Sequence, residues 1–178
     1  MSAICVYCAS GPVGDSYLRL AADLGTALGD GGHTLVSGGG NVSMMGAVAR
    51  ATRAAGGQTV GVIPQALVDR EVADTAADEL IVTDTMRQRK ALMDDRADGF
   101  ITLPGGIGTL EELFETWTGG YLGMHDKPVV LLDAGGFYAP LLAWLDDLAE
   151  RGFVSDRALN RLLIAATVAE ALELATAR

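Results

Sequence analysis

The sequence has little positive charge and no long apolar run, and each of these shortages argues against a class of partner. Lys and Arg number 13 against 23 Asp and Glu, which gives a net charge of −10. An acidic chain is a poor match for a nucleic-acid backbone, which proteins neutralise with clustered cations. No apolar run reaches the roughly 18 residues that a membrane span requires, and no basic segment leads into an apolar one as in a signal peptide. We therefore expect a cytoplasmic protein with no nucleic-acid partner and no membrane partner.

Cysteine and histidine are also scarce, and their spacing argues against a metal or redox centre. His33 and His125 have no metal-ligand spacing with each other or with cysteine, so we expect no metal. Cys5 and Cys8 form a C-x-x-C inside an apolar segment that is typical of a strand. Positions three apart on a strand point to opposite faces and lie about 10 Å apart, too far for a disulfide. We expect two buried free thiols. The chain also lacks the G-x-S-x-G elbow of serine hydrolases.

The residues present in excess are apolar residues and glycine. Of 178 residues, 49% are hydrophobic and 20% are charged, which predicts one compact domain spanning 1–178. The 23 glycines are about twice the usual share of roughly 7%. Many of them follow apolar runs, where the ligand loops of α/β proteins lie. The sequence shows no internal repeat, low-complexity tract or dividing linker.

Short apolar segments alternate with amphipathic stretches of helical length, a pattern typical of a parallel sheet buried on both faces. It predicts a three-layer, Rossmann-like, doubly wound α/β domain with a mostly parallel sheet. We predict strands at 3–8, 33–37, 58–63, 79–82, 98–103, 127–132 and 161–165. Helices are predicted at 15–30, 43–55, 84–96, 109–122, 138–151 and 168–177, with 64–78 as the main irregular connection.

Three helix ends carry local signals in the sequence. Asp15 or Ser16 is expected to cap the first helix, and the glycines at 31–32 are expected to end it. Thr167 and Glu170 form a capping box before the last helix. These signals support the alternation of strands and helices.

The most informative segment is Pro104-Gly105-Gly106-Ile107-Gly108-Thr109-Leu110-Glu111-Glu112, which directly follows the apolar run 99–103. Glycines let the backbone approach a ligand closely, and the start of a helix offers unpaired N–H groups and a positive dipole end. This junction is a candidate phosphate site with a carboxylate one turn into the helix. In isolation, Thr109 and Glu112 are better explained as a capping box.

Two loops after other strands have a similar character. Gly38-Gly39-Gly40 follows the second predicted strand, and Ser43-Met44-Met45-Gly46 comes soon after it. The segment is neither a G-x-G-x-x-G fingerprint nor a P-loop, so alone it is equally a tight turn or a ligand loop. Cys8-Ala9-Ser10-Gly11 follows the first strand with small residues. Because the carboxyl ends of parallel strands line one crevice, the loops together favour a ligand site.

The helix after Thr85 presents an unusual face. Met86, Arg89, Lys90 and Met93 share it at i, i+3, i+4 and i+7. Methionine offers a polarizable surface to an aromatic base, and the cations suit phosphate or heterocycle acceptors. Spacing alone favours a different interpretation, in which long cationic side chains snorkel at the edge of the core.

Together these motifs resemble the LOG (Lonely Guy) family, long described as "lysine decarboxylases". The segment 104–112 is similar to its PGGxGTxxE motif, and Met86 with Arg89-Lys90 to its M-x-x-R-K helix. The remaining similarities are Cys8-Ala9-Ser10, Gly38-Gly39-Gly40 with Met44-Met45-Gly46, and Leu122-Gly123-Met124-His125-Asp126-Lys127-Pro128. The resemblance covers nearly the whole chain. A departure lies at Thr118-Gly119-Gly120-Tyr121, where many relatives read Thr-Trp-Ala/Ser-Gln.

The resemblance implies an enzyme that hydrolyses the N-glycosidic bond of a cytokinin riboside 5′-monophosphate, or of AMP, to the free base and ribose 5-phosphate. It implies no cofactor, and a homodimer with the active site near the subunit contact. The catalytic residues would be Arg89 and Glu112. The substrate-binding residues would be Ser10, Gly39, Gly40, Met86, Lys90, Gly105, Gly106, Gly108 and Thr109.

Three other functions compete with this one. A lysine decarboxylase would need pyridoxal phosphate on a lysine, and no Schiff-base context such as Ser-x-His-Lys is present. A non-catalytic nucleotide carrier would not need Arg89 and Glu112 together. A general AMP nucleosidase cannot be separated from a cytokinin-specific enzyme by the sequence. The departure at 118–121 affects either the wall of the base pocket or a subunit contact.

Overall fold

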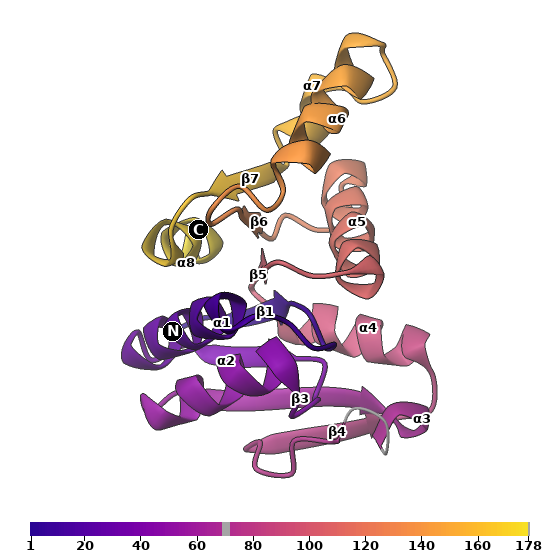
Figure 1. Ribbon diagram of the computed structural model, residues 1–178. Coiled ribbons are helices and arrows are strands. Elements are labelled where there is room, and N and C mark those ends of the chain that lie inside the picture. Colours follow the sequence, from indigo (N-terminus) through magenta and orange to yellow (C-terminus); the bar gives the residue numbers. More distant parts are fainter. Residues whose placement is uncertain (69–71, 178) are drawn as a thin grey trace.

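The structure is a computed structural model that describes residues 1–68 and 72–177 (Figure 1). Within these described residues, seven strands alternate with helices. The strands are β1 (Ala3–Tyr7), β2 (Thr34–Ser37), β3 (Gln58–Pro64), β4 (Glu79–Thr83), β5 (Gly99–Thr102), β6 (Val129–Leu132) and β7 (Leu162–Ala165). The helices are α1 (Asp15–Asp30), α2 (Ser43–Ala54), α3 (Gln65–Val68), α4 (Met86–Arg96), α5 (Ile107–Leu122), α6 (Ala139–Glu150), α7 (Asp156–Leu159) and α8 (Val168–Thr176). No helix among the described residues is long and apolar enough to cross a membrane.

The strands form one sheet with the order β4-β3-β2-β1-β5-β6-β7, and every neighbouring pair is parallel. The chain winds outward from β1 to β4 on one side, then returns to β5 beside β1 and winds outward to β7. The strand order therefore reverses between β1 and β5. This is the doubly wound α/β architecture that the sequence predicts, and such a reversal opens a crevice at the carboxyl ends of the two strands.

Helices cover both faces of the sheet and enclose two apolar cores (Figure 1). Helices α1, α2 and α8 pack on one face, and α4, α5 and α6 pack on the other. Successive strand residues face opposite cores, so Cys5 lies in the second core and Cys8 in the first. Both are buried free thiols, as predicted. Burial is the main cause that raises the pKa of each thiol well above its ordinary value.

The sequence predicted all seven strands, and the structure corrects several details of the helices. Two short helices were missed: α3 lies within the segment 64–78, of which 69–71 are outside the described residues, and α7 follows the N-cap Ser155. Neither Asp15 nor Ser16 caps α1, because its N-cap is Gly14 and no side chain bonds there.

The glycines at 31–32 do end α1. Before α8, the Thr167 hydroxyl accepts a hydrogen bond from the Glu170 N–H, as the capping box requires. The Glu170 carboxylate accepts from the N–H of Ala166 rather than from that of Thr167.

Candidate active site

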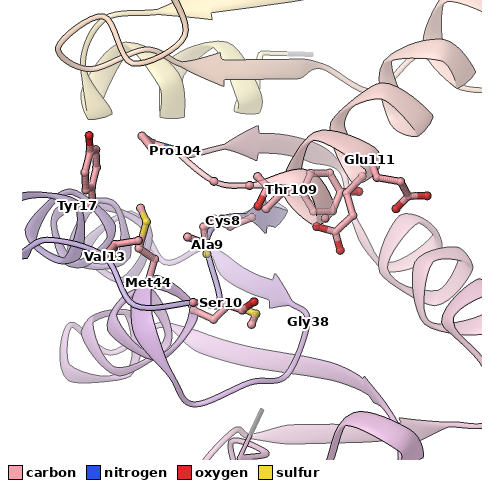
Figure 2. A pocket seen from close by; sticks show the side chains of 18 of the residues that line it. Cys8, Ala9, Ser10, Val13, Tyr17, Gly38, Met44, Pro104, Thr109 and Glu111 are labelled. Carbon is pink, nitrogen blue, oxygen red and sulfur yellow. The ribbon is translucent and has the colours of Figure 1, made fainter. Parts of the chain in front are cut away.

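A cavity of about 520 Å³ lies where the strand order reverses, at the carboxyl ends of β1, β2 and β5. Figure 2 shows Tyr17 and Val13 near one end of it, Thr109 and Glu111 near the other, and the β1 loop with Cys8 and Ala9 between them. Its wall comes from the predicted loops and from α4 and α5. The lining residues include Ser10, Gly38, Met86, Arg89, Gly105, Gly106, Gly108, Thr109 and Glu112.

The loop after β5 and the first turn of α5 form one wall of the cavity. Helix α5 begins at Ile107, two residues earlier than predicted, and its N-cap is Gly106, with no side-chain cap. Thr109 therefore lies inside the first turn, and the capping-box interpretation of Thr109 and Glu112 is wrong. Glycine is required at 105, because a Cβ there would lie 2.1 Å from the Thr109 hydroxyl oxygen. The early helix N–H groups and this hydroxyl lie at the cavity wall.

Backbone hydrogen bonds hold the loops after β1, β2 and β5 together. The N–H of Ala9 donates to the Pro104 carbonyl at 3.2 Å, which joins the β1 loop to the β5 loop. The Ser43 hydroxyl donates to the Gly11 carbonyl, which joins α2 to the β1 loop. Ser10 lies between these two contacts, exposed at the cavity wall. The cavity is thus preformed by the fold.

Arg89 enters the cavity wall from α4 and is 5% exposed. Its Nε donates to the Val62 carbonyl at 3.1 Å, and its Nη2 donates to the Gly38 carbonyl at 2.9 Å. Nη1 lies 3.8 Å from the sulfur of Met86, another lining residue. A capping box formed by Thr85 and Gln88 stabilises the first turn of α4, the helix that carries Arg89. A buried cation is thereby held in one orientation at the cavity.

Glu112 lies in α5 opposite the β1 loop and is half-buried. Its carboxylate affects the pKa of two neighbouring residues in the cavity wall. After burial, Glu112 is the second cause that raises the pKa of the Cys8 thiol, and it contributes to the raised pKa of the Tyr7 phenol. The Tyr7 hydroxyl in β1 shares a hydrogen bond of 3.0 Å with the hydroxyl of Thr116, which lies in α5 like Glu112. The raised pKa values keep Cys8 and Tyr7 neutral, and the carboxylates that line the cavity are those of Glu111 and Glu112.

Three of the residues predicted to bind substrate are not among those that line the cavity. Lys90 pairs with two carboxylates of α5, those of Glu111 and Glu115, the latter at 2.7 Å. Gly39 packs against β3, and its carbonyl accepts from the N–H of Asp74. Gly40 forms an isolated bridge with Ala73. These two glycines shape the loop after β2 instead of the cavity surface.

Sequence reasoning missed several residues that line the cavity. Gly38 lies directly against the Arg89 guanidinium, and Tyr17 makes an edge-on contact with Phe137 at 5.8 Å between ring centroids. Gly38 is the first glycine of a loop that the sequence analysis singled out, and Tyr17 lies in the first turn of a helix that was predicted. Phe137 comes from a loop far along the chain, and nothing local in its sequence marks it.

Sequence comparisons place the chain among nucleotide-processing enzymes. The family model described as "possible lysine decarboxylase" matches residues 45–175. A cytokinin riboside 5′-monophosphate phosphoribohydrolase of Mycobacterium tuberculosis is 57% identical over 95% of this chain and 90% of the relative. The protein of the same name from Mycobacterium marinum is 55% identical over 96% and 91%. The rice protein LOG is 44% identical over 96% of this chain and 71% of the relative.

Solved structures share the fold. A molybdenum cofactor binding protein from Rippkaea orientalis has a TM-score of 0.74 and 26% identity, covering 97% of this chain and 94% of that one. The molybdenum cofactor carrier protein of Chlamydomonas reinhardtii has a TM-score of 0.70 and 24% identity, covering 96% and 93%. The second likeness concerns the fold alone.

Proposed function

The chain belongs to the LOG family, whose model is described as "possible lysine decarboxylase", and from this membership we propose a function. The domain 1–178 hydrolyses the N-glycosidic bond of a cytokinin riboside 5′-monophosphate and releases the free base and ribose 5-phosphate. One observation carries the proposal: Arg89, Glu112 and the N-terminus of α5 line the same cavity. A cation, a carboxylate and an anion-binding helix end are the groups that this reaction needs.

The 5′-phosphate is bound at the start of α5. The backbone N–H groups of Gly105, Gly106, Gly108 and Thr109, with the Thr109 hydroxyl, surround it, and the positive end of the helix dipole attracts it. Glycine at 105, 106 and 108 leaves the backbone uncovered, so phosphate oxygens reach the N–H groups directly. Ser10 faces the cavity from the opposite loop and assists binding.

Glu112 and Arg89 carry the chemistry. Breaking the bond between base and ribose builds positive charge on the sugar ring, as in other glycoside hydrolyses. The Glu112 carboxylate stabilises that charge and orients the ribose hydroxyls or the attacking water. Arg89 does not give up its proton. It hydrogen-bonds the departing base, which gains electron density as the bond breaks, and it helps to orient Glu112. Met86 offers the base a polarizable contact.

Plain AMP is a second proposed substrate, since it shares the phosphate, ribose and purine of the cytokinin nucleotide. The groups assigned above contact those shared parts and not the N6-substituent. Comparing kcat/KM for isopentenyladenosine monophosphate and AMP decides whether the enzyme is cytokinin-specific or a general AMP nucleosidase.

A nucleotide carrier is the competing function, favoured by the fold shared with the molybdenum cofactor binding protein. The identity to that protein is 26%, against 57% to the phosphoribohydrolase of M. tuberculosis. A carrier also gains nothing from a carboxylate opposite the ribose. Release of free adenine-type base at catalytic enzyme concentration excludes a carrier, and binding without release contradicts our proposal.

The decarboxylase in the family description would need pyridoxal phosphate, and the lysines do not fit it. The chain has two lysines, Lys90 and Lys127, and neither is among the residues that line the cavity. Lys127 donates to the carbonyl of Asp94 and pairs with its carboxylate at 3.3 Å. Burial alone would lower the pKa of Lys90, but its bonds to Glu111 and Glu115 outweigh burial and raise it. A Schiff-base lysine needs the opposite shift.

Arg89→Ala should eliminate most turnover, whereas Lys90→Ala should stay within a few-fold of the wild type. Arg89 lines the cavity with its planar guanidinium, whereas Lys90 is not among the lining residues and is paired with Glu111 and Glu115. The measurement is kcat and KM for base release from isopentenyladenosine monophosphate, and Lys90→Ala is the matched control on the same helix. Equal losses confined to KM in both variants would contradict the roles assigned here.

We further propose a cytoplasmic homodimer with no nucleic-acid partner. The free thiols Cys5 and Cys8 suit a reducing compartment, and the net charge of −10 disfavours nucleic acid. The dimer contact is proposed at the α5–α6 groove, an apolar cavity of about 370 Å³. Phe114, Trp117, Thr118, Tyr121, Trp144, Leu145, Leu148, Phe153, Val154, Ser155 and Ala158 line it. Within the segment 118–121, where the chain departs from many relatives, Thr118 and Tyr121 line this groove, and neither lines the active-site cavity.

Trp144→Glu should convert the dimer to a monomer. Trp144 is 54% exposed beside Phe153, which is 75% exposed, and a monomer rarely leaves such aromatic area uncovered. Light scattering coupled to size-exclusion chromatography gives the mass. Ile164→Glu, at an exposed apolar site on the edge strand β7, is the matched control and should leave the mass unchanged. A wild-type monomer, or a dimeric Trp144→Glu variant, would contradict this contact.

A further inference from the structure

Gly38 lines the cavity, and its carbonyl accepts a hydrogen bond from Nη2 of Arg89 at 2.9 Å. It is the last residue before the chain turns away from β2, and it is buried. We propose that Gly38 is a positioning residue of the hydrolysis: its carbonyl and its missing Cβ together form the seat that holds the Arg89 guanidinium at the cavity. This inference rests on the function proposed above for Arg89.

The seat is built from two backbone carbonyls on neighbouring segments. Gly38, after β2, accepts from Nη2 at 2.9 Å, and Val62, in β3, accepts from Nε at 3.1 Å. The last register pair of the parallel strands β2 and β3 is Ser37 with Gly61. Each of the two carbonyls belongs to the residue that directly follows this pair, so the end of the sheet sets their spacing. Two adjacent N–H groups of a planar fork then fix both the position and the rotation of the guanidinium.

Glycine is needed at 38 for space. A Cβ built on Gly38 would lie 2.0 Å from Nη2 and 3.0 Å from Cζ of Arg89. The requirement is not conformational, because Gly38 is absent from the residues with a left-handed φ. Gly39 differs: its φ is +74°, and a Cβ there would meet Ile63 and the Val62 nitrogen at 3.1 Å. Neighbouring glycines thus serve separate purposes, one for the turn and one for the arginine.

A larger side chain at 38 would therefore displace the arginine while leaving the sheet intact. The clashing atoms belong to the far end of the flexible Arg89 side chain. The backbone of Gly38 does not have a left-handed φ, so alanine can adopt its conformation. The third atom near the built Cβ, the sulfur of Met45 at 3.2 Å, is also on a flexible side chain. Catalytic groups lose most of their effect when they move by about 1 Å, so displacement should appear in kcat more than in KM.

The test is a double-mutant cycle on base release from isopentenyladenosine monophosphate. Gly38→Ala should lower kcat by roughly two orders of magnitude or more, with a smaller change in KM and with the far-ultraviolet circular dichroism of the wild type. In the Arg89→Ala background, Gly38→Ala should not lower kcat any further, because no guanidinium is present to be displaced. In the Arg89→Lys background, Gly38→Ala should also leave kcat unchanged, since lysine has no guanidinium to bond both carbonyls. Gly14→Ala is the matched control: a Cβ there meets no atom within 4 Å, and Gly14 lies outside the cavity wall.

Wild-type kcat in Gly38→Ala, or the same fold-loss in the wild-type and Arg89→Ala backgrounds, would overturn the inference. If Gly38→Ala does not fold, the double variant with Arg89→Ala decides: folding restored by removing the guanidinium supports the seat, and continued misfolding overturns it. A wild-type protein that releases no base would contradict the proposed function instead. The seat is then tested by a crystal structure of Gly38→Ala, where a guanidinium still bonded to the carbonyl at 38 overturns it.

Discussion

Glu112→Gln should nearly abolish base release while nucleotide binding and fold survive. Glutamine keeps the size and shape of the side chain and removes the charge that the proposed mechanism needs opposite the ribose. Because Gly106 is the N-cap of α5 and Glu112 lies beyond the first turn, the substitution leaves the start of the helix untouched. Loss of one preorganised electrostatic group typically costs about 10²–10³ in kcat, and we expect at least that.

Single-turnover hydrolysis measures the loss, and ligand-induced thermal shift measures binding. Glu115→Gln is the matched control, because Glu115 lies on the same helix but pairs with Lys90 outside the cavity. It should keep near-normal turnover. If Glu112→Gln also turns over normally, Glu112 has a structural role and the mechanism proposed here is wrong.

The fold could be predicted because its signals are local. Each strand is a short apolar run, and most of the long helices are amphipathic stretches, so period and length place them; the polar helix α4 is marked instead by its capping box at Thr85 and Gln88. The errors fall where several weak signals compete. At the start of α5, Thr109 and Glu112 have capping-box spacing, yet the helix begins at Ile107. A glycine N-cap offers no side-chain acceptor to the first N–H groups of the helix, which leaves them open to a ligand, and the Thr109–Glu112 spacing gave no sign of this earlier start.

Only those parts of the site that form short motifs in the sequence could be predicted. The loop at 104–112 and the Arg89 face were found because several informative residues lie within one helical turn or one loop. Gly39, Gly40 and Lys90 were included for the same reason, and the structure places them beside the cavity wall instead of in it. Which glycine of a run faces the ligand depends on how the loop packs against β3, and that is tertiary information. Phe137 and Tyr17 meet across about 120 residues and carry no joint signal.

The 5′-phosphate should be required for efficient hydrolysis, so the riboside should be a far poorer substrate than its monophosphate. Gly105, Gly108 and Thr109 place backbone N–H groups and a hydroxyl at the cavity wall beside the positive end of α5. Charge-assisted hydrogen bonds contribute about 1.5–3 kcal/mol each. At about 1.4 kcal/mol per tenfold, losing two or three of them lowers kcat/KM by about two to six orders of magnitude.

Part of that loss should appear in kcat and not only in KM. Binding energy from a remote group fixes the reacting part of a substrate against the catalytic residues, and here the phosphate holds the ribose against Glu112, one turn along the same helix. The measurement is base release from isopentenyladenosine with and without its 5′-phosphate, with EDTA present in both reactions as a check on metal dependence. Added inorganic phosphate should inhibit the monophosphate reaction competitively, because it occupies the same helix end. Comparable rates for riboside and monophosphate would mean that the loop at 104–109 does not bind phosphate, and the orientation of substrate proposed for this cavity would fail with it.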